Sequence, residues 1–248
     1  MDNEIEDAAV NLLFAEEEEQ LLDRIVEFLD NLNPNIVTLA SSTFQTLEMV
    51  FFSTLIAFVI GFPIGIMLNS TSKYGITPRP VLNLVVSRII DVLRSFPFVI
   101  LMIVLLPFTR LVLKTAIGTA ATIIPLSIAA APFVARITES ALAEVDSGMV
   151  LAARAMGSTN SQIIFKVLIP EAMPSVISGL TLTIINLVSY SAMAGTLGGG
   201  GLGDLAIRYG YQRFQTDIMV DAVIVIIVIV ALVQFLGTRL CNKMLSKR

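Results

Sequence analysis

Apolar residues occur along this chain in long runs that are separated by short polar segments. A helix needs about 20 apolar residues to cross the roughly 30 Å hydrocarbon layer of a bilayer. Five segments meet or approach this length: 44–68, 81–107, 116–137, 172–197 and 218–240. The pattern therefore predicts an all-α, polytopic membrane protein with five transmembrane helices.

The second predicted span is interrupted by charges. Its apolar run, 95–107, is too short to cross alone, so we expect the helix to begin near Val81 and to include Arg88, Asp91 and Arg94. These residues are spaced i, i+3, i+6 on one helical face and can pair as a charge ladder. Charges at membrane depth often mark a transport pathway, but an interfacial position is an equal alternative.

Prolines and glycines suggest the local shape of two spans. Pro97 predicts a bend and Pro107 a stop, because proline lacks the N–H that an interior helical turn requires. Gly61 and Gly65 form a GxxxG pattern, which is typical of close helix packing.

One face of the fourth span, 172–197, combines polar and polarizable residues. Asn186, Ser189, Tyr190 and Met193 recur there at helical spacing. Polar groups at this depth favour a cavity or another helix, so the face is a candidate for the translocation pathway. Met193 is flexible enough to plug a narrow passage, whereas ordinary hydrogen bonding between helices is the alternative.

The glycines after this span match the sequence pattern of a nucleotide-binding motif, but not the structural context that the motif requires. Residues 198–203 spell G-x-G-x-x-G, but a dinucleotide site requires a preceding strand and a βαβ unit. We expect a tight external turn instead. The fifth span, 218–240, is rich in valine and isoleucine and is predicted to be a lipid-facing wall.

Composition supports a membrane protein and excludes several kinds of chemistry. Hydrophobic residues make up 55% of the chain, and the mean hydropathy is +0.84. There is no histidine, and Cys241 is the one cysteine. Histidine-based metal sites or catalysis and an internal disulfide are therefore excluded, and we expect neither a metal nor a cofactor.

The net charge of −4 hides an uneven distribution. Residues 1–30 hold eleven acids against Arg24 alone, whereas the remainder holds 15 bases and nine acids. Residues 11–32 have the periodicity of an amphipathic acidic helix, which would be either solvated or in contact with a partner. We therefore divide the chain into an acidic N-terminal extension, 1–39, and a transmembrane domain, 40–248.

Lysine and arginine near the span ends predict the orientation. Five spans place nine such residues on the side of the 69–80 loop, the 138–170 loop and the C-terminus, against five on the other side. Since positive residues favour the cytoplasm, we expect the C-terminus inside and the acidic N-terminus outside.

The 138–170 loop is too structured for a simple connector. Segments 141–154 and 159–166 can both form short helices, separated at Gly157. A glycine there would allow the chain to turn or a partner to approach closely. We interpret the loop as a docking surface for another protein.

At these positions the chain resembles the permease subunits of ABC importers. Their cytoplasmic loop carries E-A-A, three residues, G, nine residues, I, one residue, then L-P. The counterparts here have the same spacing and are Leu151-Ala152-Ala153, Gly157, Val167 and Ile169-Pro170. Leu151 replaces the first glutamate. The resemblance implies an ATPase-coupling loop that contains Ala152, Ala153, Arg154, Gly157, Ile169 and Pro170.

Over about residues 40–245 the blocks look most like those of methionine importer permeases, including 94–101, 131–136, 154–157 and 190–193. This implies a homodimer in the bacterial inner membrane, two cytoplasmic ATPase subunits and an external substrate-binding lipoprotein. It also implies that Met193 is a gate and that the chain itself, which has no Walker loop, hydrolyses no ATP.

Three alternatives remain open from the sequence. The substrate could be another small amino acid or an analogue of one. An ion-coupled secondary transporter would need its own ion site and usually internal repeats, which we do not find. A membrane anchor for a cytosolic enzyme would not need the polar face at Asn186, Tyr190 and Met193. Nothing in the sequence indicates a nucleic-acid partner.

Overall fold

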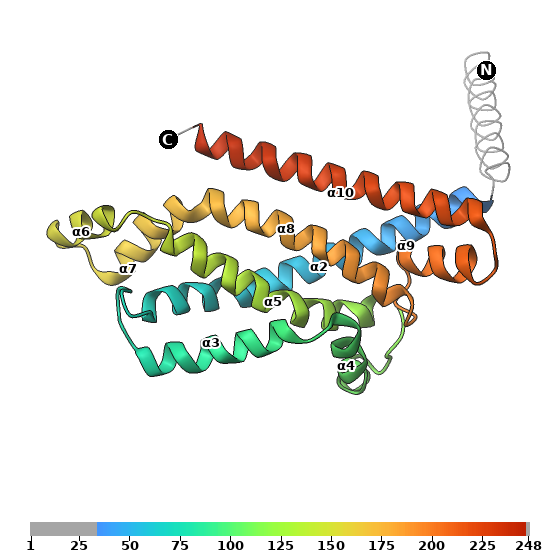
Figure 1. The fold of residues 1–248 in the computed structure, drawn as a ribbon, viewed down its shortest axis with the longest axis horizontal. Coiled ribbons are helices and arrows are strands. Elements are labelled where there is room, and N and C mark those ends of the chain that lie inside the picture. Colours follow the sequence, from blue (N-terminus) through green and yellow to red (C-terminus); the bar gives the residue numbers. More distant parts are fainter. Residues whose placement is uncertain (1–33, 247–248) are drawn as a thin grey trace, which may run out of the picture. The chain divides into compact units, whose positions relative to one another are not determined.

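The computed structural model describes residues 34–246 of the 248-residue chain (Figure 1). Its α-helices are α2 (Pro34–Thr71), α3 (Pro80–Ser95), α4 (Phe98–Leu113), α5 (Thr119–Ala143), α6 (Ser147–Ala155), α7 (Asn160–Ile163), α8 (Ile169–Gly195), α9 (Gly201–Asp204) and α10 (Thr216–Leu245). Two π-helical segments, η1 (Ile164–Leu168) and η2 (Leu205–Tyr211), follow α7 and α9. The described residues contain no strand. The predicted acidic helix, 11–32, lies outside them.

The chain divides into two compact units, Met1–Ser41 and Ser42–Arg248. Of the first unit, the structure describes the opening turns of α2, Pro34–Ser41. The rest of α2 and all later helices belong to the second unit.

Within residues 34–246, four helical stretches are long and apolar enough to cross a membrane, and α3 with α4 forms a fifth candidate that is bent by 104°. The expected second span is thus not one continuous helix. Pro97 lacks an N–H and forces the preceding Phe96 into extended backbone, so α3 ends there and α4 begins in a new direction.

The predicted stop at Pro107 is wrong. Pro107 lies inside α4, which continues to Leu113 and ends at Lys114 in the left-handed conformation, with φ of 59°. A membrane-spanning helix tolerates proline where neighbouring groups compensate for its missing hydrogen bond. Here α4 packs along α5.

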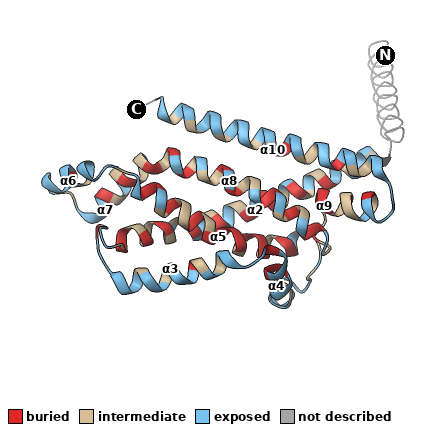
Figure 2. Cartoon of the chain, in the orientation of Figure 1, coloured by how far each residue is buried: buried red, intermediate tan, exposed pale blue. Residues whose placement is uncertain are grey.

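Helix α5 is the centre of the second unit. It packs against α3, α4 and α8, and 61% of its apolar window is buried; Figure 2 shows it mainly in red and tan, with little pale blue. Helix α2 approaches it at Gly61 and Gly65: a Cβ added at Gly65 would lie 2.5 Å from the Ala135 carbonyl oxygen. The close packing predicted for this GxxxG pattern is therefore present.

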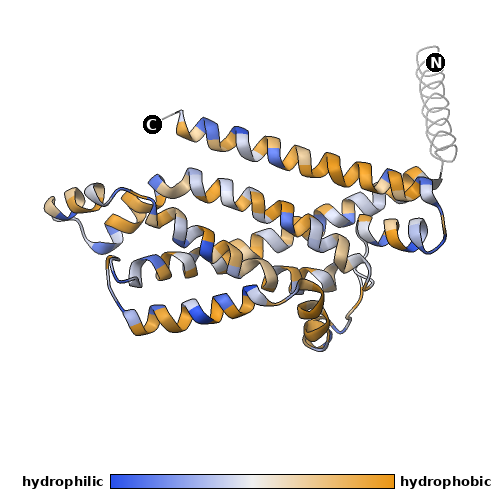
Figure 3. Cartoon of the chain, in the orientation of Figure 1, coloured by the Kyte–Doolittle hydropathy of each residue, from blue (hydrophilic) through white to orange (hydrophobic). Residues whose placement is uncertain are grey.

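Helix α10 has the opposite character. Only 11% of its apolar window is buried, and many of its valines, isoleucines and leucines are exposed. Figure 3 shows most of the α10 ribbon in orange, the colour of hydrophobic residues. It is attached along α8, where Gly237 lies against Thr181. This is the arrangement expected for a lipid-facing wall.

The bundle has two distinct ends. One carries α6 and α7, and the C-terminal part of α10 lies there as well, because the Cys241 thiol contacts the Pro174 carbonyl oxygen at 3.5 Å (Figure 1). The other end carries α9 and η2, where the amides of Gly201 and Leu202 donate to Gln45 Oε1 and Thr46 Oγ1. We refer to these as the α6–α7 end and the α9 end.

Candidate functional site

The segment 144–168 forms a helical hairpin whose turns are set by local side-chain and backbone hydrogen bonds. Asp146 caps α6 by accepting from the Gly148 amide at 2.8 Å. Beyond the turn, Thr159 and Gln162 form a capping box that starts α7. Of the two predicted short helices, the first is present but begins at Ser147, because α5 extends to Ala143. The second is not a separate helix, because α7 and η1 continue into α8 as one helical stretch from Asn160 to Gly195.

The turn between the two helices depends on Gly157. This residue has φ of +80°, which carries little penalty for glycine only. Its amide donates to the Arg154 carbonyl at 2.9 Å, and the Ser158 amide donates to the Ala153 carbonyl at 3.1 Å. These two bonds form a Schellman motif, so the end of α6 has a defined geometry.

Apolar contacts hold the inner face of this hairpin against the bundle. Ala153 is 3% exposed, and it packs in a cluster with residues from α5 and α8. The other buried members of this cluster are Ile76, Ala141, Leu142, Ile163, Leu168, Ala172 and Val176. Arg154 adds a hydrogen bond of 3.2 Å to the Ile76 carbonyl. The hairpin is therefore a packed part of the bundle, able to transmit force to α5 and α8.

The outer face of the hairpin is apolar and uncovered. Leu151, Met156 and Phe165 are 64%, 80% and 66% exposed. We call these three residues the hairpin face. Isolated exposed apolar residues are common, but three on one short hairpin indicate a protein contact. Our sequence reasoning treated Leu151 as a departure from a motif and missed the other two, which stand out as apolar residues in a polar loop.

The predicted coupling residues divide between the two faces. Ala152 and Gly157 are exposed on the hairpin, whereas Ala153 is buried and Ile169 is half-buried. Arg154 fastens the hairpin to the 72–79 loop through Ile76. Pro170 follows directly after the π-helical turn η1, within the helical stretch that runs from Asn160 to Gly195.

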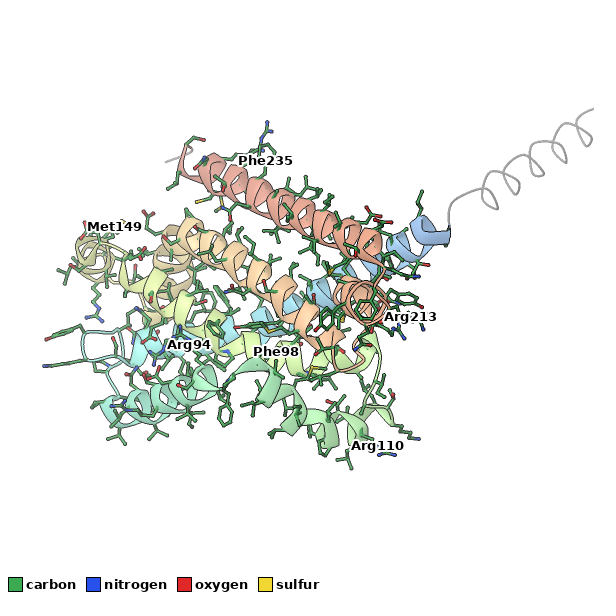
Figure 4. All side chains as sticks on the ribbon, turned by 45° about the vertical axis from the view of Figure 1, so that its right-hand side comes forward. Arg94, Phe98, Arg110, Met149, Arg213 and Phe235 are labelled. Carbon is green, nitrogen blue, oxygen red and sulfur yellow. The ribbon has the colours of Figure 1, made fainter. Side chains whose placement is uncertain are left out.

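The polar face predicted on the fourth span is an exposed stripe of α8. Leu182, Asn186, Ser189 and Met193 are exposed along it, and we call these residues the α8 stripe. Tyr190 instead turns toward α4, where its ring stacks on Phe98 at 4.7 Å between centroids (Figure 4).

The predicted ladder of Arg88, Asp91 and Arg94 does not form. Asp91 pairs with Arg136 of α5 at 2.7 Å, and Arg94 places its guanidinium over the Phe133 ring at 4.9 Å. No ion pair joins the three α3 residues to one another in the part of the chain that the structure describes.

Asp91 pairs with Arg136 rather than with Arg88 or Arg94, because Arg136 is held in place by several acceptors at once. Its guanidinium donates to Asp91, to Glu139 at 2.6 Å and to the Ser87 carbonyl at 3.2 Å. A planar group with five N–H donors can satisfy all of these acceptors. Arg136 belongs to the charge count and to the resemblance block 131–136 but is not among the residues predicted for the site; its spacing of i, i+3 from Glu139 was the available signal. Within residues 34–246, acids and thiols form no cluster suited to a metal.

Comparisons with known proteins agree on one family. Residues 61–248 match the family described as "Binding-protein-dependent transport system inner membrane component". The chain is 48% identical over 205 residues to the "Probable D-methionine transport system permease protein MetI" of Vibrio cholerae, covering 83% of this chain and 91% of that protein. It is 44% identical over 210 residues to the "Methionine import system permease protein MetP" of Bacillus subtilis, covering 85% and 95%.

A solved structure agrees with these sequence matches. A chain of the MetNI methionine ABC transporter, in an inward-facing conformation, is 42% identical and superposes with a TM-score of 0.84. The match covers 86% of this chain and 98% of that one. Because the family match extends over most of the sequence, this chain belongs to the inner membrane components of binding-protein-dependent transport systems.

Proposed function

We propose that this chain is the transmembrane permease subunit of an ATP-driven importer for methionine. Two relatives of 44% and 48% identity are named as methionine or D-methionine permeases, and the similar solved chain belongs to a methionine ABC transporter. The substrate identity rests on these relatives. Import of another small amino acid is the second candidate function. Competition between labelled methionine and other unlabelled amino acids in an uptake assay distinguishes the two.

The observation that carries this proposal is the hairpin face. Leu151, Met156 and Phe165 present apolar surface on a hairpin whose other side is packed into α5 and α8. We assign this surface to a cytoplasmic ATPase subunit, one for each permease copy. The chain has no G-x-x-x-x-G-K-[ST] loop, so the partner would supply ATP hydrolysis.

A second copy of the chain would complete the pathway. The α8 stripe exposes Asn186 and Ser189 from a membrane-spanning helix. The Ser189 hydroxyl donates to the Ile185 carbonyl, but exposure of the Asn186 amide is costly against lipid. An identical stripe on a two-fold related copy would enclose these residues in a channel between the copies. Met193 would then be the gate, with Tyr190, braced against Phe98, in the channel wall.

We assign the α6–α7 end to the cytoplasm and the α9 end to the outside, where a substrate-binding lipoprotein would deliver methionine. This orientation rests on the lysine and arginine count. In the same assignment, residues 1–39 are an acidic extension outside the membrane and 40–248 are the transport domain. A cysteine at Ser158, in a Cys241→Ser background, should react with an impermeant thiol reagent from the cytoplasmic side only; labelling from outside would reverse the assignment.

Transport would follow an alternating-access cycle. ATP binding would close the two ATPase subunits and move the hairpins docked on them. Because Ala153 and Ile163 are packed against α5 and α8, hairpin motion would displace those helices together. The ATP-bound partners would thereby favour one of two pathway conformations.

The test is uptake of labelled methionine by proteoliposomes that contain the permease, the ATPase and the binding protein. We expect uptake that requires ATP and all three proteins. Met156→Asp should abolish co-purification of the ATPase, because a charge would be buried unpaired in the contact. Tyr211→Asp is the control, since Tyr211 is also exposed but lies in η2 at the α9 end, away from the hairpin face. Uptake driven by an ion gradient without the ATPase would overturn the proposal.

A further inference from the structure

A charged hollow lies near the α6–α7 end, between α3, α5 and α8. It has a volume of about 330 Å³, and its polar lining comes from Arg94, Arg136, Ser140, Glu144 and Ser175. Binding pockets for small molecules begin at about 300 Å³, so the volume suits a small ligand. The hollow is distinct from the hairpin face, and its glutamate and two serines were not among the predicted site residues.

The available positive charge in this hollow belongs to Arg94. Arg136 is already engaged by Asp91 and Glu139. Among residues 34–246, by contrast, no carboxylate pairs with Arg94, and its guanidinium is held over the Phe133 ring. A guanidinium stacked in this way keeps its in-plane N–H donors free for a carboxylate.

The negative charge comes from the opposite wall. Glu144 is the C-cap of α5, and its carboxylate accepts a hydrogen bond from the Ser175 hydroxyl at 3.1 Å. The C-terminal end of a helix carries partial negative charge, which adds to that of the carboxylate. The hollow thus presents an unpaired cation and an anion to the same space.

The α8 stripe leads to this hollow. Ser175, Leu182 and Ser189 are seven residues apart and exposed, and seven residues make almost two helical turns. They therefore share one face of α8, with Asn186 and Met193 beside them. A solute that passes Met193 along this face would reach Ser175 and the hollow at the α6–α7 end.

We propose that this hollow is an exit site for a zwitterionic amino acid, with the α-carboxylate on Arg94 and the α-ammonium on Glu144. The assignment rests on the proposed function, since it takes the α8 stripe as the pathway. Each charged group of the ligand meets an opposite charge, so a compound lacking either group loses one of the two contacts. The side chain of the amino acid is not selected here, because the hollow is open.

The test measures protection of a cysteine at Ser140, an exposed position in the hollow, in a Cys241→Ser background. The permease–ATPase complex without its binding protein is treated with a maleimide. L-methionine at four times its Kd should slow alkylation about fivefold by mass action. Methioninol, which lacks the carboxylate, and 4-(methylthio)butyrate, which lacks the ammonium, should not protect at the same concentration. Arg94→Gln and Glu144→Gln should each abolish protection, whereas Arg88→Gln, outside the hollow, should retain it.

Methionine uptake by the parent cysteine variant is measured in parallel. Normal ATP-dependent uptake without protection would overturn the exit site and leave the proposed function standing. Equal protection by all three compounds, or protection that persists in Arg94→Gln, would overturn recognition of a zwitterion. Absence of ATP-dependent methionine uptake would overturn the proposed function and the exit site with it.

Discussion

Two substitutions at Gly157, one small and one large, can separate two effects on the hairpin. One effect is backbone strain in the turn, and the other is steric blocking of the surface that is proposed to bind the ATPase. The Gly157 φ of +80° belongs to the left-handed region, and a Cβ built at this position meets no atom within 4 Å. Any substituent therefore incurs the same backbone penalty of about 1–2 kcal/mol, which reflects crowding of Cβ against the backbone. The Cβ atom itself adds no clash to this penalty.

Gly157→Ala should consequently leave the hairpin folded, because Ala153 and Ile163 hold it in the apolar cluster. Gly157→Trp has the same local strain but projects a large ring from the exposed turn. We expect the alanine variant to retain the ATPase with at most about a tenfold weaker Kd, which corresponds to 1.4 kcal/mol. The tryptophan variant should lose the complex altogether.

The assay is co-purification of the ATPase from detergent, with methionine uptake as the functional readout. Both variants should be inserted in the membrane at the parental level, which controls for misfolding. If Gly157→Trp retained the complex as well as Gly157→Ala does, the turn would lie outside the contact and the docking assignment would be refuted.

Three further outcomes follow from the packing and the ion pairs. Gly65→Leu should lower stability in a detergent thermal melt by about 1–3 kcal/mol through overpacking against α5, whereas Val59→Leu on the exposed side should change little. Arg136→Gln should cost about 1–3 kcal/mol by leaving Asp91 and Glu139 without their shared partner; an equal loss in Arg88→Gln would contradict that role. Met193→Ala should raise basal leak or uncouple ATP hydrolysis while assembly stays intact, and unchanged leak and coupling would reduce Met193 to packing.

Local sequence signals predicted the elements of the fold well. Hydropathy located the apolar spans. Gly157 marked the turn between α6 and α7, because glycine adopts the positive φ of this turn without the steric cost that a Cβ would bring. Pro97 indicated the bend because its missing N–H is likewise a property of the residue itself. Pro107 misled us, since whether a helix tolerates proline depends on what surrounds it.

Contacts between distant parts of the chain could not be predicted in this way. Spacing on α3 suggested that Asp91 would pair with Arg88 or Arg94, but α5 brings Arg136 to it from 45 positions away. The hollow at Arg94 and Glu144 likewise exists only because α3 and α8 both pack on α5.

The amino-acid sequence alone predicts the apolar spans, the position of the turn at Gly157 and the class of transporter that the loop motif resembles. These properties depend on residues close together in the chain, whose hydropathy and backbone preferences act locally. The packing of the helices, by contrast, is needed to know which arginine pairs with Asp91, which side of the hairpin is uncovered and where the α8 stripe leads. Those outcomes depend on how distant helices pack, because burial and charge pairing are properties of neighbours in space.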